Sequence, residues 1–339
     1  MNDTFLKACR GEQTDYTPVW MMRQAGRYMP EYQQIRGQVS FLELCKNPDL
    51  CVEVTLQPVE LFGMDAAILF SDILILMEAM GMPLEFHEGR GPIFHRTVRD
   101  QEAVDGLRQP RAGEDLGFVM ETIALLRRRL DVPLIGFAGA PFTCATYLIE
   151  GGSSKTFWET KKLMYQQPAV FHGLMEKITT ATIDYLQAQA EAGAQALQLF
   201  DSWVGILAPD DFTEFALPYV QRIVAALKPH GLPFIYFANN GATLLELSVA
   251  TGADVIGLDW RLPIGEAIKR VGPRAVQGNL DPFALLLPEE RLRQRIARLL
   301  EAARPAHGHI FNLGHGIHQH TPPQQVRLAV RLVHELSRR

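Results

Sequence analysis

Short, almost wholly apolar segments alternate along the chain with longer segments whose apolar residues recur every three or four positions. The first kind is typical of parallel strands buried on both faces, and the second of amphipathic helices. The apolar segments predict eight strands, at 18–22, 66–70, 133–138, 196–200, 233–238, 255–260, 275–280 and 309–313. The periodic segments predict helices at 41–62, 115–130, 169–192, 210–227, 243–250, 264–271, 289–303 and 323–337.

Residues typical of helix boundaries mark several of the periodic segments. Proline and capping side chains stand together at 209–211 and 321–323, where helices are expected to begin. Glycines follow four of the segments, as expected where a helix ends before the next strand: Gly193, Gly231, Gly252 and Gly272. The chain therefore repeats strand and helix in a regular order.

Eight strands, each followed by a helix, predict an α/β fold, namely a single (β/α)8 TIM barrel domain over residues 1–339. No change in composition and no flexible linker divides the chain. A doubly wound sheet is the alternative, but the glycine-rich fingerprint of such sheets does not follow the first strand. The segment 84–99, with Gly89, Gly91 and Pro92, predicts an inserted hairpin.

The composition is that of an ordinary globular protein, with 47% hydrophobic and 21% charged residues. The net charge of −5 argues against nucleic acid or an anionic membrane as a partner, so attraction for an anionic ligand must be local to a site. The most apolar stretch, 66–84, contains Ser71, Asp72 and Glu78. These residues favour a buried strand and helix over a membrane span.

The cysteines and the N-terminus bear on the cellular location. Cys9, Cys45, Cys51 and Cys144 form no C-x-x-C pair, so neither a disulfide framework nor a structural zinc site is expected. Charged residues near the N-terminus interrupt any apolar core of a secretory signal. We therefore expect a cytoplasmic protein.

Two arginines four positions apart, Arg23 and Arg27, follow the first predicted strand. A guanidinium can bind a carboxylate or phosphate through two parallel hydrogen bonds. Gly26, between them, allows a sharp turn or the close approach of a ligand. The functional interpretation is a clamp for a molecule with several anionic groups, and the alternative is a surface turn with solvated arginines. The preceding strand and the glycine favour the clamp.

Active sites of TIM barrels lie at the carboxyl ends of the strands. The residues that follow the predicted strands, with the connection after the third, are Arg23, Arg27, Ser71, Asp72, Phe142, Thr143, Tyr147, 150–154, Asp201, Ser202, Asn239, Asn240, Asn279, Asp281 and 314–316. This set is rich in groups that bind anions or form hydrogen bonds. Asp72 has an alternative role as a helix cap, Ser202 as a turn hydroxyl and Tyr147 as a core residue.

Histidines are concentrated near the C-terminus, where His315 stands between two glycines that free the backbone. This setting favours a functional role for His315. The other histidines of the region are His307, His309, His318 and His320. A metal site is disfavoured, because their spacing matches no helix-face pair and His307 and His315 lie at opposite ends of a strand.

Taken together, the motifs resemble those of the uroporphyrinogen decarboxylase family. They are MRQAGRYMPEY at 22–32, FSDIL at 70–74, GFAGAPFT at 136–143, YLIEGG at 147–152, FDSW at 200–203, GNLDP at 278–282 and NLGHGI at 312–317. They extend over nearly the whole chain in the family's order, and the first and last are the most specific.

The resemblance implies a homodimeric (β/α)8 barrel with facing active-site clefts and without a metal or organic cofactor. It implies loss of the four acetate carboxyl groups of uroporphyrinogen III, giving coproporphyrinogen III in haem biosynthesis. Family roles in catalysis carry over to Asp72, Arg23 and Arg27. Family roles in substrate binding carry over to Arg23, Gln24, Ala25, Gly26, Arg27, Asp72, Tyr147, Ser202 and His315.

The residues agree with this chemistry. A substrate with eight carboxylates calls for an arginine clamp, and loss of CO2 beside a pyrrole needs a cationic ring to accept electrons. A carboxylate under the ring, Asp72, can bind the pyrrole N–H groups and stabilise that cation. The proton donor stays open between an arginine and a water that it orients.

Two alternatives from other classes remain. A corrinoid-linked methyltransferase of the same barrel type needs a zinc-thiolate site near the last strands, but the last cysteine is Cys144. A non-catalytic tetrapyrrole carrier needs the clamp but not Asp72. Activity on the substrate distinguishes the carrier from the enzyme.

Overall fold

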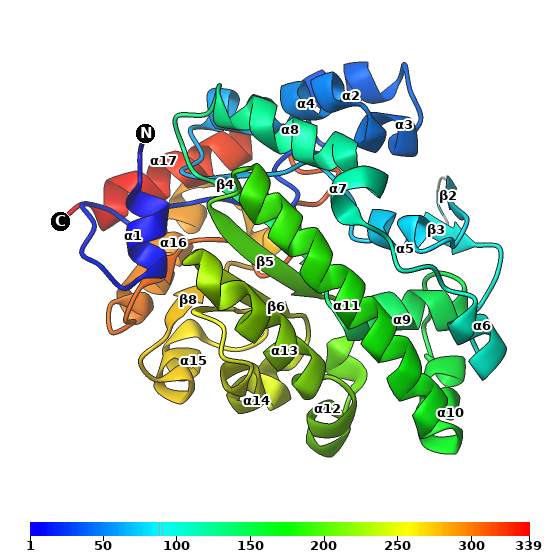
Figure 1. The fold of residues 1–339 in the computed structure, drawn as a ribbon. Helices are drawn as coiled ribbons and strands as arrows, with labels where there is room; N and C mark the ends of the chain where they lie inside the picture. The colour runs from blue at the N-terminus through cyan, green and yellow to red at the C-terminus, as the bar shows by residue number, and fades with distance from the viewer. Residues whose placement is uncertain (88, 90) are drawn as a thin grey trace.

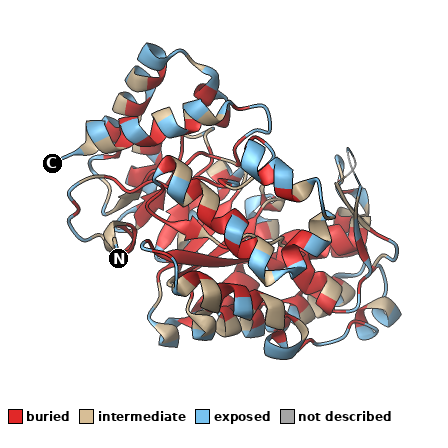
Figure 2. Ribbon diagram, turned by 90° about the horizontal axis from the view of Figure 1, so that it is seen from above, coloured by how far each residue is buried: buried red, intermediate tan, exposed pale blue. Residues whose placement is uncertain are grey.

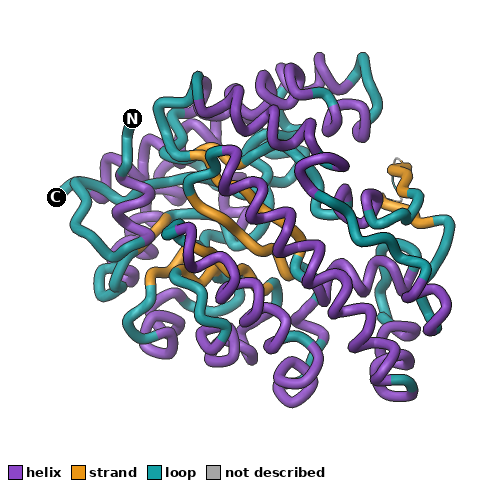
Figure 3. The backbone as a smooth tube through the Cα atoms, viewed as in Figure 1, coloured by secondary structure: helices purple, strands orange, loops and turns teal. Residues whose placement is uncertain are grey.

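The computed structural model describes residues 1–87, 89 and 91–339, and a curved sheet of seven parallel strands lies at its centre (Figures 1 and 3). Neighbouring strands pair in the order β1, β4, β5, β6, β7, β8 and β9. Their bounds are β1 (Ala67–Ile68), β4 (Leu134–Gly139), β5 (Ala196–Asp201), β6 (Phe234–Ala238), β7 (Val255–Gly257), β8 (Ala275–Gln277) and β9 (His309–Ile310). Each overlaps a segment predicted as a strand.

The first predicted strand, 18–22, closes the barrel without forming a regular strand. Val19 makes a single parallel bridge to Phe311, just after β9, and the N–H of Asp65, just before β1, donates to its carbonyl at 2.8 Å. The prediction of a five-residue strand was wrong because the chain turns at once, with the Gln24 N–H donating to the Met21 carbonyl. The segment nevertheless fills the gap between β9 and β1, and the predicted TIM-barrel fold is confirmed.

Helices surround the sheet (Figure 1). The longer ones are α4 (Pro48–Phe62), α8 (Gly117–Arg127), α9 (Pro141–Glu150), α10 (Trp158–Gln166), α11 (Pro168–Ala192), α13 (Leu217–Leu227), α15 (Ile264–Val271), α16 (Glu289–Ala303) and α17 (Pro323–Ser337). The shorter ones are α1 (Thr4–Cys9), α2 (Pro30–Arg36), α3 (Phe41–Lys46), α5 (Ile75–Ala79), α6 (Gln101–Asp105), α7 (Ala112–Asp115), α12 (Pro209–Phe215) and α14 (Leu245–Ala250), with 3-10 turns η1 (Val204–Ile206), η2 (Lys228–His230), η3 (Gly241–Leu244) and η4 (Pro282–Leu286). In the described part of the chain, none of these helices combines the length and apolarity that a membrane crossing requires.

Two predicted helices are each divided by a proline. The segment 41–62 breaks at Asn47, whose side chain accepts the N–H of Leu50 and caps α4 ahead of Pro48. The segment 210–227 breaks at Ala216, because Pro218 in the first turn of α13 cannot donate to a preceding helix. Apolar periodicity continues through both breaks, so the sequence pattern alone did not reveal them.

The sheet is the most buried part of the molecule (Figure 2). Every residue of β4, β5 and β6 is buried, as expected for strands covered on both faces. Polar side chains also meet inside the barrel, where Trp20 Nε1 donates to Gln277 Oε1 at 2.9 Å and Gln277 Nε2 donates to Gln198 Oε1 at 3.2 Å. The barrel is therefore filled by side chains at this level.

A separate antiparallel hairpin, β2 (Leu84–His87) and β3 (Gly91–Phe94), stands beside α5 (Figure 1). Positions 88 and 90, which belong to the hairpin segment predicted at 84–99, lie outside the described residues. The N–H of Phe94 donates to the Gly151 carbonyl at 2.9 Å, and Ile93 bridges to Gly152. The hairpin is thus attached to the turn that follows α9.

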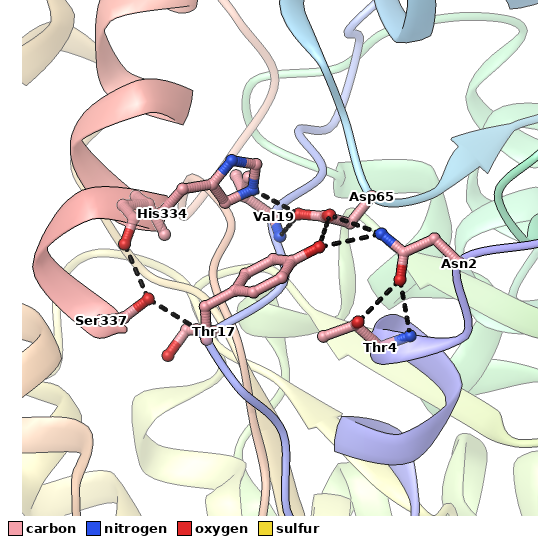
Figure 4. Close-up of polar contacts among 9 residues, drawn as sticks. Asn2, Thr4, Thr17, Val19, Asp65, His334 and Ser337 are labelled. Atoms are coloured by element: carbon pink, nitrogen blue, oxygen red, sulfur yellow. Dashed lines mark hydrogen bonds and ion pairs between the residues drawn. The ribbon is translucent and has the colours of Figure 1, made fainter. Parts of the chain in front are cut away.

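A buried carboxylate ties both termini to the start of the sheet (Figure 4). Asp65 accepts hydrogen bonds from the Val19 N–H at 2.8 Å, the Tyr16 hydroxyl at 2.7 Å and the Asn2 amide at 3.2 Å. His334 Nε2 of α17 lies 2.7 Å from its second oxygen. Since Asp65 precedes β1, this network holds the barrel closed at the end opposite the carboxyl ends of the strands.

Candidate active site

The loop after the first predicted strand presents Arg23 at the mouth of the barrel. Arg23 has a φ of 60°, a left-handed conformation that is uncommon for a residue with a side chain. The next side chain, Gln24, is buried, and its amide accepts from the Met21 N–H and donates to the Ala66 carbonyl. Gln24 therefore anchors the loop to the barrel interior, whereas Arg23 and Arg27 are exposed.

The backbone of the same loop offers donors. Within the described part of the chain, the N–H groups of Ala25, Gly26 and Arg27 donate to no backbone carbonyl and to no side chain. Consecutive unpaired N–H groups beside two guanidinium groups favour the binding of an anion. The predicted residues 23–27 thus present exposed charges and unpaired backbone donors, while the buried Gln24 side chain anchors the loop to the barrel interior.

Asp72 lies just after β1 and is half-buried. One carboxylate oxygen accepts the N–H of Leu74 at 2.8 Å, in a turn that leads into α5. Burial raises the pKa of Asp72 to about 6, although the Leu74 N–H and the Arg23 charge act in the opposite direction. Asp72 therefore stabilises the turn before α5 through one oxygen and is not the N-cap of that helix, which is Leu74, while the second oxygen keeps its capacity to accept.

Tyr147 and His315 both lie near the charge of Arg23. Burial, followed by the Asp72 charge, raises the pKa of Tyr147 to about 12. Burial, followed by the charges of Arg23 and Arg261, lowers the pKa of His315 to about 4. A Cβ placed on Gly316 would lie 2.4 Å from Arg23 Cδ, so the stem of Arg23 crosses the loop after β9. Arg23 thus stands among Asp72, Tyr147 and His315.

Ser202 follows β5, and Arg27 lies at the end of the loop that carries Arg23. Ser202 is half-buried after β5, and its carbonyl accepts from the Asn239 amide at 3.1 Å. Its neighbour Trp203 packs edge-on against Tyr147, with ring centroids 5.8 Å apart. Arg27 is exposed. Burial of Tyr32 raises its pKa to about 12, and the nearby charge of Arg27 acts in the opposite direction. Tyr147 and Ser202 are therefore linked through Trp203.

Beneath Trp203, a buried polar network supports the floor of the site. The Thr143 hydroxyl donates to Asp201 at 2.6 Å and the Tyr236 hydroxyl donates to its other oxygen at 2.8 Å. Burial raises the pKa of Asp201 to about 6. Because both Asp201 oxygens are engaged and the residue is fully buried, this predicted candidate supports the site from within.

Four further polar atoms at strand ends are buried without a hydrogen-bond partner among the described residues. They are Ser71 Oγ, Asn239 Oδ1, Asp259 Oδ2 and Asn312 Nδ2. Buried polar groups are almost always paired, because leaving them unpaired costs about 1–3 kcal/mol each. These atoms belong to residues that follow β1, β6, β7 and β9, so unused hydrogen-bonding capacity is concentrated beneath the carboxyl ends of the strands.

The sequence analysis found no candidate after the sixth predicted strand, where the structure places Trp260 and Arg261. The guanidinium carbon of Arg261 lies 3.8 Å from the centroid of the Trp260 ring. Trp260 in turn packs edge-on against His315, with centroids 6.4 Å apart. The sequence analysis missed Trp260 because the predicted strand 255–260 included it, whereas β7 ends at Gly257.

Metal-binding residues do not converge at this site. Within the described residues, no group of three or more His, Cys, Asp and Glu side chains is placed to hold a metal ion. The four cysteines are buried, and burial raises the pKa of each thiol. His318 and His320 lie on an exposed loop, 5.2 Å apart between ring centroids. The described residues after the strands thus combine the Asp72 carboxylate with a neighbouring cation, Arg23, and with neutral hydrogen-bonding groups.

Comparisons with known proteins agree with the motifs. The family profile described as Uroporphyrinogen decarboxylase (URO-D) matches residues 1–336. A protein named uroporphyrinogen decarboxylase from Desulfotalea psychrophila is 73% identical over 99% of both chains. One of the same name from Carboxydothermus hydrogenoformans is 54% identical over 99% of this chain and 97% of its own.

Among solved structures, a methyltransferase from Methanosarcina mazei superposes with a TM-score of 0.81 at 23% identity, over 98% of both chains. A B12-independent methionine synthase from Shewanella sp. W3-18-1 superposes with a TM-score of 0.61 at 11% identity, over 95% of this chain and 97% of its own. At these identities the likeness establishes the fold alone, and the methyltransferase alternative gains no support from it.

Proposed function

Because the chain belongs to the uroporphyrinogen decarboxylase family and is a decarboxylase of porphyrin biosynthesis, we propose that it converts uroporphyrinogen III to coproporphyrinogen III with its own side chains alone. Each of the four acetate arms loses CO2 and takes up one proton, so that CH2–COO⁻ becomes CH3. The observation that supports the site assignment is the position of Arg23, whose stem crosses the loop of His315 at Gly316 and whose charge acts on Asp72, Tyr147 and His315. That arrangement supports the proposal, because a polyanionic macrocycle with a cationic intermediate needs both a cation and a carboxylate close together.

The chemical difficulty lies in the electron pair left when the bond to CO2 breaks. A pyrrole ring protonated on carbon is cationic and accepts that pair. Protonation of the resulting exocyclic methylene then yields the methyl group, and the ring carbon releases its extra proton. The enzyme accelerates this sequence to the extent that it stabilises the cationic ring more than the neutral one.

Asp72 supplies that stabilisation in the proposed mechanism. The Leu74 N–H holds one carboxylate oxygen in place at 2.8 Å, which orients the other towards the ring N–H groups. Its pKa of about 6 leaves the carboxylate charged at neutral pH. Pyrrole N–H donors favour the charged form further, because hydrogen bonds to a carboxylate lower its pKa.

The remaining residues hold the carboxylate arms. Arg23 and the N–H groups of Ala25 to Arg27 bind the arm that reacts, and Arg27 binds a neighbouring one. The Tyr147 hydroxyl stays protonated at neutral pH, because its pKa is about 12, and donates to a carboxylate. Ser202 contributes a second hydroxyl. With a pKa of about 4, His315 is a neutral imidazole at pH 7 and donates one hydrogen bond.

A homodimer is part of this proposal. The resemblance to the family supports it, and so do large apolar side chains that are exposed on the described surface. They are Trp158 and Tyr165 on α10 and Phe283 and Leu286 on η4, each more than half exposed. Side chains of this kind are frequent in interfaces between protein chains.

The direct test is anaerobic incubation of the purified protein with uroporphyrinogen III, followed by separation of the products by number of carboxyl groups. We expect successive loss of carboxyl groups from eight to four. Binding of the macrocycle without any loss of CO2 would instead identify a carrier and contradict the proposed activity.

A further inference from the structure

The loop after β7 carries a cation that the mechanism above does not use. The Arg261 side chain is 42% exposed at the carboxyl ends of the strands. Its Nη1 lies 3.5 Å from Asp259 Oδ2, but in the described part of the chain its guanidinium donates no hydrogen bond. A guanidinium carries five N–H donors, and these remain available to a ligand.

The arginine is held in place from both sides. Its backbone N–H donates to Asp259 Oδ1 at 2.7 Å, and its guanidinium lies 3.8 Å from the centroid of the Trp260 ring. Stacking on an indole ring fixes a guanidinium plane while leaving its edge free. The site is therefore preorganised, which reduces the entropy lost when a ligand binds.

The stacked pair of Trp260 and Arg261 packs against the loop that carries His315. A Cβ on Gly314 would lie 2.2 Å from the Trp260 backbone nitrogen, so only glycine permits this close approach of the two loops. The Trp260 and His315 rings meet edge to face at 6.4 Å. Arg261 therefore belongs to the same rigid wall as His315, on the side of the mouth formed by β7 to β9.

The surrounding charges select the kind of ligand. Arg23 and Arg261 both act on His315 and disfavour its protonation, whereas Asp259 acts in the opposite direction. Asp259 is buried, with 3% of its side chain exposed, so it faces Arg261 from below and not the solvent. A neutral imidazole near two guanidinium groups suits a carboxylate, since the cations attract it and the imidazole N–H can donate a further hydrogen bond.

We propose that Arg261 is a further substrate-binding residue, which holds a side-chain carboxylate of the tetrapyrrole against the wall formed by Trp260 and His315. This inference rests on the proposed function and extends it, because a substrate with eight carboxylates needs more cationic contacts than Arg23 and Arg27 provide. Asp259 acts as a positioning residue that orients Arg261 through its backbone and its guanidinium.

The test compares Arg261→Gln and Arg261→Lys with Arg304→Gln. Arg304 is an exposed arginine after α16, at the opposite end of the barrel from the mouth. Binding of uroporphyrin III and coproporphyrin III, which carry eight and four carboxylates, is followed by quenching of tryptophan fluorescence. Steady-state kinetics with uroporphyrinogen III are measured alongside.

For Arg261→Gln we expect Kd for uroporphyrin and KM for uroporphyrinogen to rise about tenfold, the loss of one good charge-assisted contact. Arg261→Lys should restore part of the affinity, and Arg304→Gln should leave both constants unchanged. An equal loss for coproporphyrin assigns the contact to a propionate arm, and a smaller loss assigns it to an acetate arm.

Unchanged Kd and KM in a folded Arg261→Gln variant would overturn the assignment of Arg261 while leaving the decarboxylase intact. If the wild-type protein binds uroporphyrin but releases no CO2 from uroporphyrinogen, the proposed function is overturned. If Arg261→Gln then binds uroporphyrin more weakly than this wild-type protein, the role of Arg261 in binding is still supported. If Arg261→Gln does not fold, Arg261→Lys decides, because lysine keeps the charge and loses the bidentate geometry. An affinity for uroporphyrin equal to that of the wild type would then contradict the contact.

Discussion

Arg23 shows how one residue can organise the site. Its left-handed backbone, at a φ of 60°, costs about 1 kcal/mol or more for a residue with a side chain. The anchoring of Gln24 to the Ala66 carbonyl helps to hold this conformation. The result is that adjacent side chains point in opposite directions, with Gln24 inwards and Arg23 across Gly316 towards the mouth. In the proposed mechanism, this left-handed backbone conformation is what directs the Arg23 guanidinium to the mouth of the barrel.

At the same scale, we predict that Asp72→Asn lowers kcat by at least about a hundredfold, the size of effect seen when a preorganised electrostatic group is removed. Asparagine keeps an oxygen that accepts the Leu74 N–H, so the turn before α5 should survive. It replaces the free oxygen with an N–H donor that opposes the pyrrole N–H groups. Turnover of uroporphyrinogen and thermal unfolding are measured together.

Asp72→Glu is the matched variant, since it keeps the charge but displaces it. We expect it to retain partial activity. If Asp72 serves only as the cap of the turn, asparagine should be nearly silent, and near-normal decarboxylation by Asp72→Asn would refute the catalytic role.

The pKa of Asp72 also predicts a pH dependence. Burial raises it to about 6, so the reactive carboxylate is present above pH 6 and is lost as the pH falls below that value. We expect kcat/KM, which reports ionisations of the free enzyme, to fall about fivefold between pH 6 and pH 5 and to approach a tenfold fall per pH unit below pH 5. Asp72→Glu should move the midpoint. A profile that is flat from pH 7 to pH 5 would show that this ionisation does not control the reaction.

At the scale of elements, the site depends on loops that pack closely enough to require glycine. A Cβ on Gly316 would meet Arg23 Cδ at 2.4 Å, and one on Gly314 would meet the Trp260 backbone at 2.2 Å. The first contact involves a flexible side chain that can move, whereas the second involves backbone that cannot. The two glycines should therefore respond differently to substitution.

We predict that Gly316→Ala lowers kcat/KM for uroporphyrinogen by about tenfold or more with little loss of stability, because Arg23 yields to the new methyl group. Gly314→Ala should lower stability itself. Urea unfolding and steady-state kinetics on both variants check this. Wild-type kinetics in Gly316→Ala would mean that the position of the Arg23 stem is unimportant.

At the opposite end of the barrel, the hydrogen-bond network around Asp65 joins the first and last segments of the chain to the start of β1. We predict that Asp65→Asn lowers the free energy of unfolding by about 2–4 kcal/mol, because it removes a buried charge that accepts several hydrogen bonds and leaves donors unpaired. Urea denaturation measures the change, with the exposed Asp49→Asn as control. A loss no larger than that of the control would show that the barrel closes without this network.

The whole molecule is anionic, with a net charge of −5, yet its proposed substrate is a polyanion. Long-range attraction therefore does not bring the substrate in, and the cations gathered at the mouth must act at short range. Because only cations close to the bound substrate act on it, we predict that exposed arginines far from the mouth, such as Arg304, contribute little to the affinity for the substrate.

At this scale we also predict a homodimer of twice 38.0 kDa. Sedimentation equilibrium at micromolar concentration measures the mass, and Trp158→Ser with Tyr165→Ser tests whether α10 takes part in the interface. Full activity from a stable monomer would show that the dimer is dispensable.

The sequence by itself determined the fold class, because buried parallel strands and amphipathic helices leave different periodicities in the chain. It also indicated Arg23, Asp72, Tyr147 and His315 as neighbours at one face of the barrel, since residues after parallel strands meet there, and their functional roles stay predictions. Their motifs were sufficient to indicate the family. It could not show where strands and helices end, because an apolar pattern continues through breaks such as those at Asn47 and Ala216.

Only the tertiary structure decided the direction and neighbours of each side chain. Gln24 and Arg23 are adjacent in sequence, yet hydrogen bonds to Met21 and Ala66 turn one into the interior. Arg261 meets His315 through Trp260 although 54 positions separate Arg261 from His315 along the chain. Such contacts depend on the register of neighbouring strands and on glycines that let loops approach. Neither leaves a periodic signal in the sequence.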